Sequence, residues 1–226
     1  MMRITRNFMS AKLFGNNRTM SNRKHMMDRL QSSNVSVNVF NQGLLGNDGI
    51  TSRTSNTSLI YQNMKNNAGE LQSAASKLVY SGDNSVFAKA EKNGNTDEVT
   101  EQIQDFVTYY NDMVRSLKNS NSRVDGSYRN MLNSYATMYQ SALKETGITK
   151  QADGTLSIDE KTLQEASMEQ LQNAWGGNNS FAAKAGTTAA YVRTSAVSNL
   201  NSLITNSYSN LLRGYGNSGN FFNFWM

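Results

Sequence analysis

The residue types that could do chemistry are few in this sequence, and they stand apart from one another. The single histidine, His25, lies in the basic N-terminal segment away from any cluster of acidic residues, and the chain has no Cys. Histidine-activated nucleophiles and sites built from imidazole or thiolate ligands therefore have no candidate residues. The glycines also lack the spacing and the Lys-Ser/Thr ending of a phosphate-binding loop. We expect no catalytic residue and no cofactor.

Three carboxylates beside a predicted turn resemble a calcium loop only superficially. Asp153, Asp159 and Glu160 do not follow the alternating ligand spacing of an EF-hand loop. The remaining carboxylates are scattered along polar helix faces, and no pair suits acid and base roles. We therefore predict no metal site and no small-molecule substrate, and a protein that is not an enzyme.

The strongest pattern is an apolar stripe in the segment 96–117. Asp97 and Glu98 open this segment, and Arg115 and Lys118 close it, an arrangement that suits the helix dipole. Steps of four and three residues place the stripe on one side of a helix with the mean period of a coiled coil. We predict that it forms a core or assembly seam of these residues: Val99, Ile103, Phe106, Tyr110, Met113 and Leu117.

Three further segments carry apolar stripes at helical spacing, namely 58–79, 128–145 and 187–212. Asn67 lies on the first stripe, where a polar group can fix register and partner number, unless the helix turns it to the edge. The second stripe is rich in Tyr and Met, which suits an adaptable interface as well as the core that we favour. It comprises Tyr128, Met131, Tyr135, Met138 and Ala142, with Leu143 as a further candidate at its end. Polar connectors are predicted at 80–95 and 119–127.

The last long helix, predicted for 187–212, continues the four-and-three spacing over its whole length. Its stripe comprises Ala189, Val192, Ala196, Leu200, Leu203 and Ser207, broadened by Val197, Ile204 and Leu211. The small residues permit a close approach of neighbouring helices.

Between the second and third of these stripes, the sequence predicts a small β element. Asp153-Gly154 forms a tight turn between two short extended pieces. Ser157 and Glu160 then have the spacing of a capping box that opens a short helix. Its inward residues would be Leu163, Met168 and Leu171, before a break at 175–179.

The two ends differ from the helical middle, so we predict three parts: 1–57, 58–212 and 213–226. The first is a basic segment, helical in part or extended, with alternating valines typical of a strand at 34–40. The last is a flexible Gly/Asn tether with an aromatic tip that docks elsewhere or folds back onto the helices. The tip comprises Phe221, Phe222, Phe224 and Trp225.

Composition agrees with a mainly α fold. The 226 residues are 38% hydrophobic and 17% charged, with a net charge of +5 and no Pro or Cys. No apolar run approaches membrane-spanning length, and the N-terminus lacks the features of a cleavable signal peptide. We predict an elongated antiparallel helical bundle or coiled coil, with a small β-turn or hairpin near residues 147–157.

Two segments carry a resemblance to a known family. The segment 103–117, with its Phe-Val-Thr-Tyr-Tyr-Asn core, and the segment 147–163, with Gly-Ile followed by Asp-Gly-Thr-Leu-Ser-Ile-Asp, resemble the flagellar cap protein (hook-associated protein 2) in the same order. The start of the chain, residues 2–9, resembles flagellins and hook–filament junction proteins. The connectors at 80–95 and 119–127 leave no room for the outer domains of a cap protein, which implies a reduced form.

The resemblance implies a non-enzymatic structural protein of the bacterial flagellum, exported without a cleavable signal peptide and located outside the cell. Its partners would be further copies of itself or other flagellar axial proteins, with an export chaperone before assembly. The alternative is a cytoplasmic helical module that uses its basic N-terminus on nucleic acid or another anionic partner. We rank nucleic acid lower, because the basic segment lacks interleaved aromatic residues.

Overall fold

A computed structural model describes the backbone of residues 50–218 and the side chains of residues 56–206. The chain divides into two compact units, Met1–Ser55 and Asn56–Met226, and the second is described here. The predictions for residues 1–49 of the basic segment, including the strand at 34–40, and for the aromatic tip of residues 221–225 lie outside the described residues. Residues 50–57, which the sequence analysis placed in the basic segment, belong to the first described helix, Ile50–Val79.

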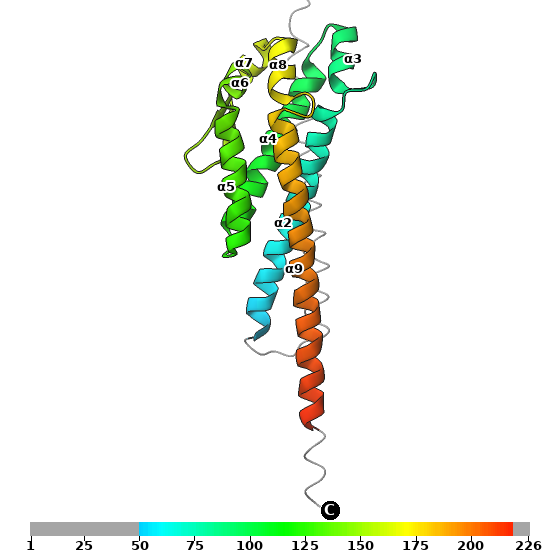
Figure 1. Cartoon of the computed structure of the whole chain (residues 1–226), viewed down its shortest axis with the longest axis vertical. Helices are drawn as coiled ribbons and strands as arrows, with labels where there is room; N and C mark the ends of the chain where they lie inside the picture. Colours follow the sequence, from blue (N-terminus) through cyan, green and yellow to red (C-terminus); the bar gives the residue numbers. More distant parts are fainter. Residues whose placement is uncertain (1–49, 219–226) are drawn as a thin grey trace, which may run out of the picture. The chain divides into compact units, whose positions relative to one another are not determined.

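The described part of the chain is mainly helical with one small antiparallel sheet, which confirms the coarse fold prediction (Figure 1). Its elements, in chain order, are α2 (Ile50–Val79), α3 (Val86–Asn93), α4 (Asp97–Lys118), α5 (Arg123–Met138), α6 (Gln140–Glu145), β1 (Ile148–Lys150), β2 (Leu156–Ile158), α7 (Glu160–Glu165), α8 (Met168–Trp175) and α9 (Phe181–Ser218).

The hairpin forms where the sequence predicts it. β1 and β2 pair antiparallel, with Ile148 opposite Ile158, and the turn between them contains Gly154 at φ 89°. Gly147, at φ 75°, leads into β1, and a Cβ there would lie 2.7 Å from the carbonyl oxygen of Asp159. Glycine is required at 147 both for its left-handed backbone and for this close approach.

The predicted capping box at Ser157 and Glu160 is wrong. Asp159 is the N-cap of α7, and its carboxylate accepts hydrogen bonds from the backbone amides of Lys161 and Thr162. Ser157 belongs to β2, where pairing with β1 holds its backbone extended. The capping box lies one helix later, between Ser167 and Gln170 at the start of α8.

Both predicted connectors contain helix. α3 lies within 80–95, where Ser85 caps its start and Gly94 ends it at φ 63°. α5 begins at Arg123, because Ser122 caps it and the buried carboxylate of Asp125 accepts a hydrogen bond from the Ser120 hydroxyl. Asp125 and Gly126, within the predicted connector 119–127, therefore lie inside the first turn of a helix.

The helix predicted for 128–145 is interrupted at Tyr139, and its buried face differs from the predicted stripe. Leu132, Ala136 and Leu143 are buried, whereas Met138 is 70% exposed. Tyr128 and Tyr135 are only partly buried at the edge of the core. Aromatic rings with a hydroxyl suit such an edge. The prediction placed these large side chains on the buried face, whereas the residues that are buried lie one position further along the chain.

The last helix also begins earlier and ends later than predicted. Ser180 caps it by accepting a hydrogen bond from the amide of Ala183, so α9 starts at Phe181. It continues to Ser218, through the first part of the predicted tether. Figure 1 shows its orange-to-red part extending below the lower end of α5. Within 50–218, no helix has both the length and the apolar character needed to cross a membrane.

Candidate functional site

The predicted seam on α4 lies in the core of the unit. All six of its side chains are buried, together with Val107 and Val114, which widen the face. Around α4 pack α3, α5, α7, α9 and strand β2. The chain's own elements thus cover this seam, so it is not available to another subunit as the molecule stands.

An aromatic cluster stands at the centre of this core. Phe106 meets Trp175 and Phe181 edge to face, with ring centroids 5.3 Å and 5.7 Å apart. Trp175 and Phe181 meet at 5.7 Å, and Tyr110 lies 5.6 Å from Phe181. Edge-to-face ring pairs stabilise a fold by more than the burial of their surface alone provides. The cluster therefore holds α4 against α8 and α9.

Two of these aromatic side chains bring polar groups into the core. The Trp175 indole donates a hydrogen bond to the Thr146 hydroxyl at 3.1 Å. The Thr146 hydroxyl in turn donates to the Leu143 carbonyl. The Tyr110 hydroxyl is buried without a hydrogen-bond partner, and burial raises the pKa of this phenol. A neutral phenol shielded from solvent has no access to a substrate, so the cluster supports packing rather than proton transfer.

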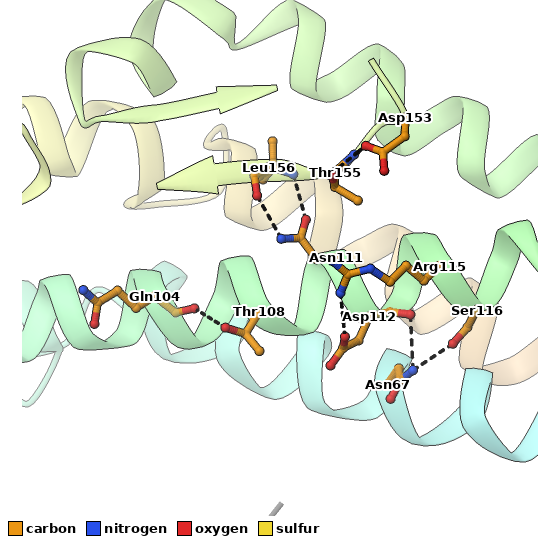
Figure 2. Close-up of polar contacts among 10 residues, drawn as sticks. All are labelled: Asn67, Gln104, Thr108, Asn111, Asp112, Arg115, Ser116, Asp153, Thr155 and Leu156. Carbon is orange, nitrogen blue, oxygen red and sulfur yellow. Dashed lines mark hydrogen bonds and ion pairs between the residues drawn. The ribbon is translucent and has the colours of Figure 1, made fainter. Parts of the chain in front are cut away.

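Asn111 joins α4 to the hairpin. Its side-chain amide donates to the Leu156 carbonyl at 2.9 Å, and its oxygen accepts from the Leu156 amide at 2.7 Å. Figure 2 shows the two bonds side by side, so the side chain takes the place of a neighbouring strand on β2. These two hydrogen bonds hold the hairpin against α4, at the polar edge of its seam.

Asn67 joins α2 to α4 in a similar way. Its amide donates to the Ser116 hydroxyl at 2.8 Å and to the Asp112 carbonyl at 3.3 Å (Figure 2). A partly buried amide with these two partners is satisfied only in one register of the two helices. The sequence left open whether Asn67 fixes register on the stripe or lies at its edge. In the structure Asn67 is partly buried beside the fully buried Ala68, and its amide bonds to α4.

The three carboxylates weighed as a calcium loop do not converge. Asp153 accepts from the amide and hydroxyl of Thr155, and these bonds hold the pKa of its carboxyl below the usual value. Asp159 accepts from Thr162 with the same effect on its pKa. Among the described residues, no group of three or more His, Cys, Asp or Glu side chains could hold a metal ion.

A shallow hollow of about 540 Å³ lies between α5 and the hairpin. It is lined by Asn130, Asn133, Ser134, Thr137, Met138 and Lys150. The Lys150 ammonium donates to the Thr137 hydroxyl at 2.8 Å. Its lining contains no carboxylate, imidazole or thiol, so the hollow offers contacts but no acid, base or nucleophile of those kinds.

The sequence interpretation missed the two aromatic residues at the centre of the cluster. Trp175 was assigned to a break and Phe181 to the segment before a helix, yet both are fully buried. Signals for both were present: Trp175 follows Leu171 at helical spacing, and Ser180 has the residue type of an N-cap. The predicted docking tail, by contrast, lies outside the described residues.

Comparison of the chain with protein-family models, with curated proteins and with solved structures finds no match.

Proposed function

We propose that this chain is a non-enzymatic, secreted structural protein of the bacterial flagellum, a reduced cap-like or hook-associated axial subunit. The observation that carries the proposal is the bond pair between Asn111 and Leu156. Asn111 belongs to the first segment that resembles the flagellar cap family, and Leu156 belongs to the second. Two separate stretches of sequence resemblance thus come together as one structural unit.

The residues that carry the resemblance also carry the local structure. Gly147 and Gly154 have the left-handed backbone that the hairpin needs, Asp153 closes its turn, and Asp159 caps the helix that follows. Phe106, in the first segment, packs in the aromatic cluster. The resemblance therefore falls on positions that the hairpin and the core depend on, which supports the proposal although the two segments are short.

The proposed subunit is an elongated antiparallel helical bundle that assembles through coiled-coil faces. Two contacts between long helices support this arrangement. Asn67 bonds α2 to α4, and a Cβ at Gly186 of α9 would lie 2.5 Å from the Cβ of Ala75 in α2. Polar residues that fix register and small residues that permit close approach are both features of paired long helices.

The test is genetic and biochemical. In a motile bacterium that carries the gene, deletion should shorten or destabilise the filaments, and the product should appear in the culture medium or in purified flagella. Restoring the gene as Asn111→Ala should rescue filaments less well than Thr108→Ala, because Thr108 lies on the exposed side of α4. Normal filaments in the deletion strain, with no product outside the cell, would refute the proposal.

A further inference from the structure

The two halves of α9 differ in how much of their apolar stripe is covered. From Phe181 to Ala196 the helix buries an inward face against its neighbours. Beyond Ala196, every described side chain is exposed or only partly buried. Val197 is 39% exposed and Ile204 is 47% exposed, although the apolar spacing continues without a break.

Most of this second half, up to Leu212, carries no charge. From Thr194 to Leu212 the sequence has no Asp, Glu, Lys, Arg or His, between Arg193 on one side and Arg213 on the other. An exposed helix normally keeps charged residues on its outer face, since these oppose association. An uncharged helix with a continuous apolar stripe is instead suited to burial against another helix.

We propose that a second copy of this chain packs its own α9 against this stripe, defined here by Val197, Leu200 and Ile204. The inference rests on the proposed function, because it names the surface and the partner through which the subunit assembles. Val197 and Ile204 are one heptad apart, with Leu200 between them, as in the seam of a paired helix.

Charge favours a second copy over the basic start of the chain, residues 1–31. That stretch carries seven Lys and Arg residues against the single Asp28: Arg3, Arg6, Lys12, Arg18, Arg23, Lys24 and Arg29. The second half of α9 offers no carboxylate to pair with them, so their burial there would cost desolvation without compensation. Two copies of the stretch 194–212 bring uncharged side chains together, and no like charges meet along the stripe.

Cysteine cross-linking of the full chain tests the contact, since the natural sequence has no Cys. Val197→Cys and Ile204→Cys proteins are oxidised gently, singly and as a mixture. Tyr191→Cys is the matched control, because Tyr191 is 54% exposed but lies on another side of α9. We expect the yield of covalent dimer to be at least several-fold above that of the control. The cysteine pair that links most efficiently then shows whether the two helices run parallel or antiparallel. Linking no better than the control would overturn the proposal.

The molar mass in solution supplies the second measurement. Wild type should be a dimer, Ile204→Asp should be a monomer, and Ser202→Asp, an exposed substitution on the opposite side of the helix, should stay dimeric. A monomeric wild type whose melting temperature falls on Ile204→Asp would show that its own chain covers the stripe, which overturns the inference. A monomer that still enters flagella overturns only this inference, whereas a dimer that is never exported overturns only the proposed function.

Discussion

The packed half of α9 and its exposed half share one helix and one apolar spacing, yet among the described residues only the first contains fully buried side chains. Phe181 lies among Phe106, Tyr110 and Trp175 at centroid distances of 5.6–5.7 Å. Ile204, on the same helix, is nearly half exposed. This difference shows that apolar periodicity in the sequence predicts an apolar helix face but does not identify the element that packs against it. Substitutions in the packed region should lower thermal stability, and those in the exposed half should change association.

The largest effect is expected from Phe106→Ala. This change removes the ring that meets both Trp175 and Phe181 and leaves a cavity in a closed core. Truncation of a buried Phe costs about 3–5 kcal/mol in the free energy of unfolding. Urea titration and thermal melting followed by circular dichroism measure it. Thr108→Ala, on the exposed side of α4, is the control and should change stability little. Equal melting of Phe106→Ala and wild type would contradict the assigned core.

A smaller loss is expected from Asn111→Ala, which leaves the amide and carbonyl of Leu156 without their partners. Unpaired, partly buried backbone groups of this kind cost about 1–3 kcal/mol in the free energy of unfolding. Hydrogen exchange should also be faster at the Leu156 amide. Asn173→Ala, on the exposed side of α8, controls for the loss of an amide side chain. Unchanged melting combined with disturbed assembly would instead make Asn111 an interface residue.

The cap of α8 gives a weaker effect within the packed region. Ser167→Ala removes the hydroxyl that accepts from the Gln170 amide and should cost about 1 kcal/mol in the free energy of unfolding. Thr96→Ala is the matched control, because Thr96 is the N-cap of α4 but its side chain makes no capping hydrogen bond. Denaturant titration compares the two variants, and an equal loss in both would show that the capping bond contributes nothing.

The smallest effect on folding is expected from Ile204→Ala, measured by thermal melting at protein concentrations low enough to dissociate copies. Ile103→Ala is the matched comparison, because it truncates the same side chain where it is fully buried. Loss of a buried Ile costs about 2–5 kcal/mol in the free energy of unfolding, whereas a half-exposed one loses far less. Equal losses in the two variants would remove the distinction between the two halves of α9.

The sequence by itself determined the parts of the fold that depend on neighbouring residues. The extent of α4 follows from its apolar period, its acidic first turn and its basic last turn, all of which act within one helix. The hairpin follows from glycines whose backbone angles other residues rarely adopt. Such signals are local, so no knowledge of the rest of the molecule is needed to read them.

The tertiary structure decided which of several possible faces and partners is used. On α5, Leu132 is buried and Met138 is exposed because the position of α4 and α9 selects the face, and both residues are equally apolar in the sequence. Asp159 caps α7 because strand pairing holds Ser157 in β2. Trp175 becomes the centre of the core only when α4 and α9 bring Phe106 and Phe181 against it. These outcomes depend on contacts between residues far apart in the chain, which propensity and spacing do not encode.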